Sequence, residues 1–186
     1  MIQLDSKAIL YMLTGVFNLN WDSTEERLKL QKTIYLLQIY GLKLDYGFSW
    51  YKYGPHSRDL VTEAYQVLRT EKAKYKHETK SWKFSENSLL RFERFKQICT
   101  DVLNDPIKLE LVASVDFAHK IFFPKEEEKE FIEEFKRKKH KLFNDARIDD
   151  SMIKKALDIS NNLRKENKGR PARCRDAKAG RRAGQG

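Results

Sequence analysis

The sequence predicts an α+β protein that is predominantly helical, with a small hairpin in its N-terminal half and only helices in its C-terminal half. Apolar residues recur at helical spacing through most of the 186 residues. Two aromatic runs, 48–53 and 74–85, favour extended structure instead. We therefore expect an N-terminal half at 1–86, a helical half at 87–166 packed on it, and a separate tail at 167–186.

Two helices are expected at the start of the chain. Ser6 is placed to cap a first helix that runs to Phe17. Ser23 and Glu26 form an S-x-x-E capping box, in which each side chain binds a backbone N–H at the start of the second helix. Gly41 ends this helix, because glycine readily takes the left-handed conformation that follows a helix C-terminus.

A strand, a third helix and a hairpin follow. Residues 48–53 predict a strand, which the Gly-Pro pair at 54–55 cannot continue. Ser57 is placed to cap a third helix that runs to Thr70. The run 74–85 has aromatic residues on both arms and predicts a hairpin. Apart from the early position of the strand, this order resembles a winged helix, so we expect a winged-helix-like N-terminal half.

The C-terminal half is expected to contain four helices. The first covers 87–104, and Asp105 with Pro106 begins the second. Residues 107–123 are the most apolar of the chain, which predicts a central, buried helix. The charged segment 126–142 has only a narrow apolar stripe and should lie on the surface. Residues 149–151 are placed to cap the last helix.

Positive charge is concentrated at the C-terminal end. The net charge is +10, and 167–186 contributes +6 of it through seven basic residues and one acidic residue. This segment lacks aromatic and branched apolar residues, so we expect it to be disordered. Its Gly, Ala and Arg composition also differs abruptly from the rest. It is either a basic arm for nonspecific nucleic-acid contact or, as we favour, an end that is not native.

The sequence favours a cytoplasmic protein that does not enter a membrane. It has no apolar run of the eighteen or so residues that a membrane helix needs. Residues 1–5 lack the basic and then apolar pattern of a signal peptide. Of the two cysteines, Cys99 falls on an apolar helix stripe and Cys174 lies in the polar tail, so no disulfide framework is indicated.

Two short motifs carry most of the functional information. The first is KLQK-x-x-Y at 29–35, on the second helix, and the second is YGP-x-S at 53–57, after the aromatic strand. Together they resemble the YwgA-like proteins and the related Panacea (SocA-like antitoxin) domain, a prokaryotic family. The segment LELVAS at 109–114 is similar to the ELLAS-type helix of that family. The resemblance implies a module that neutralises a toxin by direct contact and is not an enzyme.

The candidate partner-binding residues lie in or beside these two motifs. They are Lys29, Gln31, Lys32, Tyr35, Trp50, Tyr53, Gly54, Pro55, His56, Ser57 and Arg58. The first motif also has a structural interpretation, in which the Gln31 amide fixes the strand at 48–53 to the helix. In the functional interpretation, Lys29 and Lys32 face solvent and bind an acidic partner.

The second motif also has two interpretations. Gly54 allows a close backbone approach, Pro55 fixes the turn and Ser57 caps the next helix, which is a sufficient structural explanation. Alternatively, the helix N-terminus beside His56 and Arg58 forms an anion site. No Walker loop or G-x-G-x-x-G supports nucleotide binding.

No pattern of residues indicates catalysis. The four histidines lie in different predicted elements, and H-E-x-x-H, C-x-x-C and G-x-S-x-G are all absent. We therefore expect no catalytic residue, no metal ligand and no cofactor. Asp116 with His119, and Glu110 with Ser114, are spaced to form buried polar pairs instead.

The alternative to a toxin-like protein partner is DNA, bound by a winged-helix transcriptional regulator. The third helix is a poor recognition helix, because Asp59 and Glu63 lie one turn apart and would repel phosphates. The hairpin expected at 74–85 suits nucleic acid better, because basic residues there alternate with aromatic ones. The candidate nucleic-acid contacts are Lys74, Lys76, Lys80, Trp82 and Lys83. Lysines on an exposed hairpin also prevent edge-to-edge aggregation, which is the structural explanation.

Overall fold

The computed structural model describes residues 5–143 and 148–168, and it confirms the predominantly helical α+β class. In chain order the elements are α1 (Ser6–Val16), α2 (Thr24–Ile39), β1 (Ser49–Tyr51), β2 (Gly54–His56), α3 (Arg58–Tyr65), the π-helical turn η1 (Gln66–Thr70), α4 (Lys72–Glu78), α5 (Glu86–Ile98), α6 (Pro106–Ile121), α7 (Glu128–Phe143) and α8 (Asp150–Lys168). None of the helices in these described residues is long and apolar enough to span a membrane.

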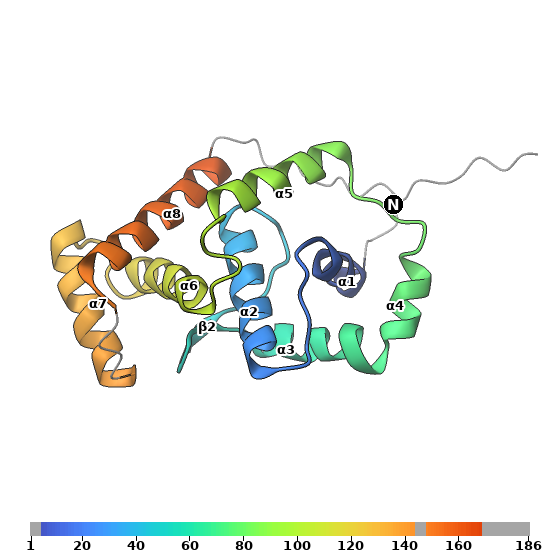
Figure 1. The fold of residues 1–186 in the computed structure, drawn as a ribbon, viewed down its shortest axis with the longest axis horizontal. Helices are drawn as coiled ribbons and strands as arrows, with labels where there is room; N and C mark the ends of the chain where they lie inside the picture. Colours follow the sequence, from blue (N-terminus) through green and yellow to red (C-terminus); the bar gives the residue numbers. More distant parts are fainter. Residues whose placement is uncertain (1–4, 144–147, 169–186) are drawn as a thin grey trace, which may run out of the picture.

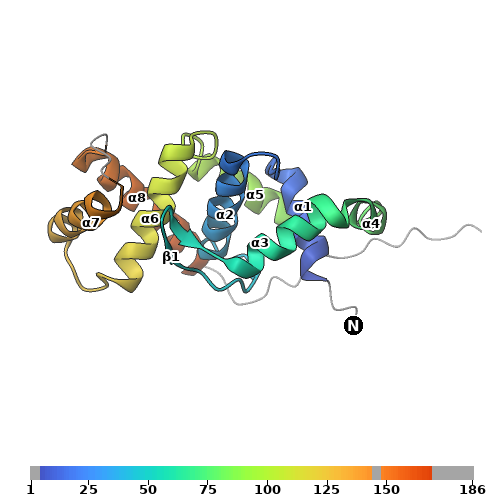
Figure 2. The ribbon, with the colours of Figure 1, turned by 90° about the horizontal axis from the view of Figure 1, so that it is seen from below.

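Helix α2 lies near the middle of the molecule, and the other elements are arranged on either side of it (Figures 1 and 2). Helices α1, α3 and α4 lie on one side, and α6, α7 and α8 lie on the other. α2 packs against α6, α8 and β2, and α6 packs against α8. One cluster of buried apolar residues runs from α1 to α8, so the two halves expected from the sequence share a core.

The predicted helix starts are largely confirmed. The Ser23 hydroxyl accepts a hydrogen bond from the Glu26 N–H, and the Glu26 carboxylate accepts one from the Ser23 N–H, both at 3.1 Å. Asp105 caps α6 through the N–H groups of the first turn, with Pro106 at the first helical position. The cap of α1 is Asp5 rather than Ser6, because the Asp5 carboxylate reaches the Lys7 N–H.

The hairpin expected at 74–85 is wrong, because this region forms α4 and a turn. Tyr75 and Thr79, four residues apart, are the buried residues of this segment, which is helical rather than alternating spacing. The Tyr75 ring stacks on Tyr11 of α1 with the ring centroids 6.5 Å apart. Burial of one tyrosine against α1 therefore decides the structure of a segment whose aromatic pattern favours strands.

The hairpin of this protein lies at 49–56 instead. Gly54 and Pro55 were expected to end the extended run, but they form β2, which pairs antiparallel with β1. Lys52 and Tyr53 connect the two strands. Gly54 has φ +82°, a conformation that glycine adopts easily, and it lets the chain turn back at this point.

The expected tail begins two residues too early. α8 extends through Lys168, and the Asn167 side-chain amide donates to the Ile39 carbonyl at 3.2 Å, at the end of α2. The remaining residues of that expected tail, 169–186, lie outside the described residues. α5 is shorter than expected and ends at Ile98, because the chain turns at Cys99 to reach α6.

Candidate functional site

The two sequence motifs meet where α2 contacts the hairpin. Gln31 is buried, and its Nε2 donates to the Ser57 carbonyl while its Oε1 accepts from the Ser57 N–H, both at 3.0 Å. One side chain thus satisfies both backbone groups of one residue. Gln31 thus makes a structural contact, but the expected partner was wrong: the amide holds the residue after β2 and not the strand at 48–53.

A second glutamine of α2 makes the same kind of contact. Gln38, two turns further along the helix, donates from Nε2 to the Tyr46 carbonyl at 3.1 Å and accepts from the Tyr46 N–H at 3.0 Å. Phe48, further along the same segment, packs its ring edge-on against Tyr35 of α2. α2 therefore fixes the chain on the way into the hairpin through Gln38 and on the way out through Gln31.

Lys32 is buried, with 2% of its surface exposed, so the expectation that it faces solvent is wrong. Its Nζ donates to the Pro55 carbonyl at 2.6 Å. An ammonium group removed from water needs such an acceptor, because burial of an unpaired charge is costly. Lys29 lies half-buried on the same helix. The first motif therefore presents its glutamine and its second lysine to the hairpin, not to solvent.

The second motif is also used structurally. The Ser57 hydroxyl caps α3 by accepting from the Leu60 N–H at 3.3 Å, as expected. A Cβ at Gly54 would overlap the hydroxyl oxygen of Ser114 on α6, which confirms the close approach expected there. The Ser114 hydroxyl is buried without a hydrogen-bond partner in the described chain, so the expected contact with Glu110 is not formed.

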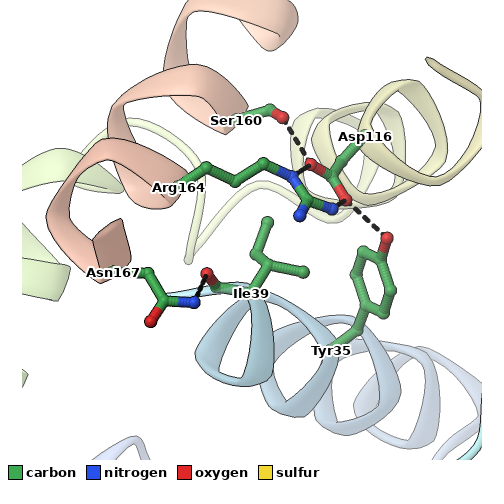
Figure 3. A network of polar contacts seen from close by, with 6 residues as sticks. All are labelled: Tyr35, Ile39, Asp116, Ser160, Arg164 and Asn167. Atoms are coloured by element: carbon green, nitrogen blue, oxygen red, sulfur yellow. Dashed lines mark hydrogen bonds and ion pairs between the residues drawn. The ribbon is translucent and has the colours of Figure 1, made fainter. Parts of the chain in front are cut away.

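Behind the hairpin, α2 is joined to α6 and α8 by a buried network centred on Asp116 (Figure 3). The Asp116 carboxylate, with no exposed surface, accepts from the Tyr35 hydroxyl at 2.5 Å and from the Ser160 hydroxyl at 2.6 Å. It also binds Arg164 at both oxygens, at 2.6 and 2.7 Å. Burial, reinforced by the Asp116 charge, raises the pKa of Tyr35 far above its usual value, so Tyr35 remains a hydroxyl donor.

The network differs from the pair that the sequence suggested for Asp116. His119 was the expected partner, but its ring packs edge-on against Phe131 of α7. The true partners, Ser160 and Arg164, were missed. The sequence does contain a pattern that indicates them. Ser160 and Arg164 continue the helical spacing of the buried residues Ile153 and Ala156 along one face of α8. Polar residues on a buried stripe indicate a buried polar partner.

The exposed part of the motif region is the turn of the hairpin. Tyr51 is 62% exposed, and its ring centroid lies 5.3 Å from that of His56 on the opposite strand. The Nζ of Lys52 lies 5.3 Å from the centroid of the Tyr53 ring, which is also exposed. Partial burial, and then the charges of Lys32 and Arg58, lower the pKa of His56.

Trp50 anchors the hairpin from its inner face. Its ring is half-buried against Phe117 and Phe122 of α6, at centroid distances of 6.0 and 5.5 Å. The Nζ of Lys138 on α7 lies 3.7 Å from the centroid of the Phe122 ring and 5.9 Å from that of Trp50. The indole N–H of Trp50 is buried and has no acceptor in the described chain. Trp50 is therefore a structural anchor whose indole N–H is unsatisfied within the described residues.

The candidate nucleic-acid residues lie on α4 and the turn after it. Lys74, Lys76, Lys80 and Lys83 are exposed, and Trp82 is half-buried against the core. Lys74 pairs with Glu71 at 3.0 Å, whereas the other three lysines have no ion pair within residues 5–143 and 148–168. The structure thus gathers these lysines on one helix and its following turn, but not on a wing.

The described residues hold no group of three or more His, Cys, Asp or Glu side chains that could bind a metal ion. Cys99 is buried, and burial raises the pKa of its thiol to about 12. The thiol is therefore protonated at neutral pH and is not a nucleophile. Comparisons of this chain with protein-family models, curated proteins and solved structures give no match.

Proposed function

We propose that this protein is a non-catalytic protein-binding module, antitoxin-like, which neutralises a toxin by direct contact. One observation supports this proposal above the others. The buried residues of the motifs hold the hairpin rigidly at its base, while Tyr51 at its turn remains 62% exposed. A preorganised aromatic side chain on a fixed element is a typical protein-binding anchor, because little conformational entropy is lost when a partner covers it.

The resemblance of the KLQK-x-x-Y and YGP-x-S motifs to the Panacea domain supplies the class of partner. Under this proposal the motif residues define the shape of the hairpin, and its exposed residues make the contact. The primary contact residues are then Tyr51 and Tyr53, with Lys52 and Arg58 beside them. Such a protein would work in the cytoplasm, where its toxin is made and where Cys99 stays reduced.

The test is co-expression with the gene next to its own in the genome. We expect that gene to arrest bacterial growth, and this protein to relieve the arrest and to form a nuclease-resistant complex of fixed stoichiometry. Both the full chain and a chain ending at Lys168 should do so, since α8 is complete at that residue. Growth arrest that persists although both proteins are expressed and soluble would contradict the proposal.

A matched pair of variants separates contact from folding. Tyr51→Ala removes the exposed ring of the hairpin, and Tyr65→Ala removes a ring that is 50% exposed on α3. We expect Tyr51→Ala to weaken the complex about tenfold or more and Tyr65→Ala to change it less than about twofold, because contact energy is concentrated in few residues. Calorimetric titration measures both. Equal effects would show that the hairpin is not the contact.

A second candidate function, nucleic-acid binding, is favoured by the lysines of α4. The segment 72–83 contains five lysines and one glutamate, and the lysines lie on exposed positions. Backbone phosphates would bind such a surface without reading sequence. Binding of a DNA duplex by the chain ending at Lys168, steeply weakened by salt and by Lys76→Glu with Lys80→Glu, would support this function. Binding that requires 169–186 would reject it.

A further inference from the structure

The two edges of the hairpin differ in whether their backbone groups are satisfied. The register pairs Ser49 with His56, Trp50 with Pro55, and Tyr51 with Gly54. In an antiparallel pair, the N–H and C=O of one residue point to the same side, and successive residues alternate sides. Pro55 has no N–H, and its C=O binds Lys32 on α2. Pro55 therefore points away from β1.

The outer edge of β2 is covered by α2. The residues of this edge that point outward are Pro55 and Ser57, two positions apart. Lys32 binds the carbonyl of the first, and Gln31 binds both the N–H and the C=O of the second. The Gln31 amide thus occupies the place that a neighbouring strand would take, and no further strand can add to β2.

The outer edge of β1 is open. Because Trp50 stands opposite Pro55, its N–H and C=O point away from β2, and neither has a hydrogen-bond partner among residues 5–143 and 148–168. The flanking residues Ser49 and Tyr51 are exposed. Figure 1 shows the hairpin projecting below α6. An open edge of this kind is a template for pairing with an extended chain.

We infer that the open edge of β1 accepts an acidic, extended segment of a protein partner as a third strand. This inference rests on the proposed protein-binding function and adds its mode. Main-chain hydrogen bonds to Trp50 would fix the register of the added strand. The exposed ring of Tyr51 would pack against alternate side chains of that strand, on the face opposite to Trp50.

The charges beside the edge select an acidic segment. Lys52 follows β1 directly, and the Lys138 ammonium lies over Phe122 beside the Trp50 ring. Neither lysine has an ion pair within the described part of the chain. A second copy of the same hairpin would bring like charges together, which disfavours edge-to-edge dimerisation. Carboxylates on the added strand would instead pair with both ammonium groups.

The test uses the full chain labelled with nitrogen-15 and a blocked seven-residue peptide that alternates valine or threonine with glutamate. One control peptide carries N-methyl groups on every residue and cannot donate along either edge, and another has lysine in place of glutamate. We expect the glutamate peptide to slow hydrogen exchange of the Trp50 amide about tenfold or more at saturation. The N-methylated and lysine peptides should leave its exchange nearly unchanged.

Charge variants supply the matched control. Lys52→Glu combined with Lys138→Glu should abolish the protection by the glutamate peptide, whereas Lys76→Glu combined with Lys80→Glu on α4 should retain it. Absence of protection at millimolar peptide, or equal protection by the N-methylated peptide, would overturn the inference. So would a concentration-dependent dimer of the free chain that itself protects Trp50, since the edge would then take a second copy.

The outcome is independent of the test of function. A toxin complex that forms while no peptide protects Trp50 would leave the function standing and remove this binding mode. Protection of the Trp50 amide by the peptide, without any toxin complex, would support the strand-addition mode and remove the antitoxin-like function.

Discussion

Helix α2 is held by two sets of buried polar contacts that differ in what they bind. On the hairpin side, Gln31 and Lys32 bind backbone atoms of Ser57 and Pro55. On the other side, Tyr35 binds the side chain of Asp116, which also holds Arg164. The first set needs a particular side chain on α2 alone, because backbone groups are present whatever the residue. The second set needs matched side chains on three helices.

This difference determines whether each set of contacts fixes the hairpin alone or stabilises the whole molecule. The contacts of Gln31 and Lys32 with backbone atoms, here called the clamp, fix the path of the hairpin and leave its side chains unconstrained. The exposed residues of the hairpin are therefore free to vary to suit a partner. A buried charge network instead joins α2, α6 and α8 into one unit. The comparison predicts that damage to the network lowers the stability of the whole molecule, and that damage to the clamp mainly loosens the hairpin.

The largest effect is expected from Asp116→Asn. This change leaves the Arg164 guanidinium largely buried without its counter-charge, and loss of one partner of a buried ion pair typically costs about 3–5 kcal/mol. Urea unfolding followed by circular dichroism measures the free energy of unfolding. Asp158→Asn, on the exposed face of α8, is the control and should change it by less than about 0.5 kcal/mol. A similarly small loss for Asp116→Asn would show that the network is dispensable.

Gln31→Ala should have the next largest effect. It leaves the buried N–H and C=O of Ser57 without partners, at a cost of about 2–3 kcal/mol. The same urea titration measures it, with Gln97→Ala on the exposed face of α5 as control. The comparison also predicts where the damage appears: amides of the hairpin should exchange faster, while those of α8 change little. Uniform acceleration in both regions would contradict the distinction between clamp and network.

Gly54→Ala should cost somewhat less, about 1–3 kcal/mol, because alanine at φ +82° is strained and its methyl group overlaps the Ser114 hydroxyl. Adding Ser114→Ala should recover part of this loss, since it removes the overlapping oxygen but leaves the backbone strain. The unfolding free energies of both single variants and the double variant are the measurement. Strict additivity would show that the α6 contact does not limit this position.

The smallest effect is a pH dependence from His56. Its pKa is lowered in the folded protein, so the unfolded chain binds the proton more tightly. The stability associated with the neutral ring is therefore complete above the ordinary histidine pKa and is lost as pH falls below it. We expect the urea concentration at the unfolding midpoint to be lower at about pH 5.5 than at about pH 7.5. The His56→Gln variant should show a smaller difference between the two pH values. An identical pH profile for His56→Gln would contradict this assignment.

Local sequence rules predicted much of this region. The S-x-x-E box, the Asp105 cap and the Ser57 cap all depend on residues near one another in the chain. The need of the Gln31 amide for a backbone partner could also be predicted. Its partner was misplaced because the sequence does not show that the Gly-Pro pair at 54–55 forms a strand.

Tertiary contacts account for what the sequence did not predict. Lys32 looks like an exposed cation in a charged helix, and its sequence neighbours do not show that the Pro55 carbonyl lies within hydrogen-bond reach of its ammonium group. α4 replaced an expected hairpin because Tyr75 packs on α1, a contact with a residue sixty-four positions away. The network of Asp116 with Arg164 joins residues that no short motif can connect.

The most direct test of the account is amide hydrogen exchange within the hairpin of the unliganded full chain. α2 fixes the hairpin through β2 and Ser57, and β1 keeps an open outer edge. We predict slow exchange for the inward-pointing Tyr51 and His56 amides and for the Ser57 amide held by Gln31, and fast exchange for Trp50. Protection of the Trp50 amide equal to that of Tyr51 would show that the edge is already covered, and would contradict the account.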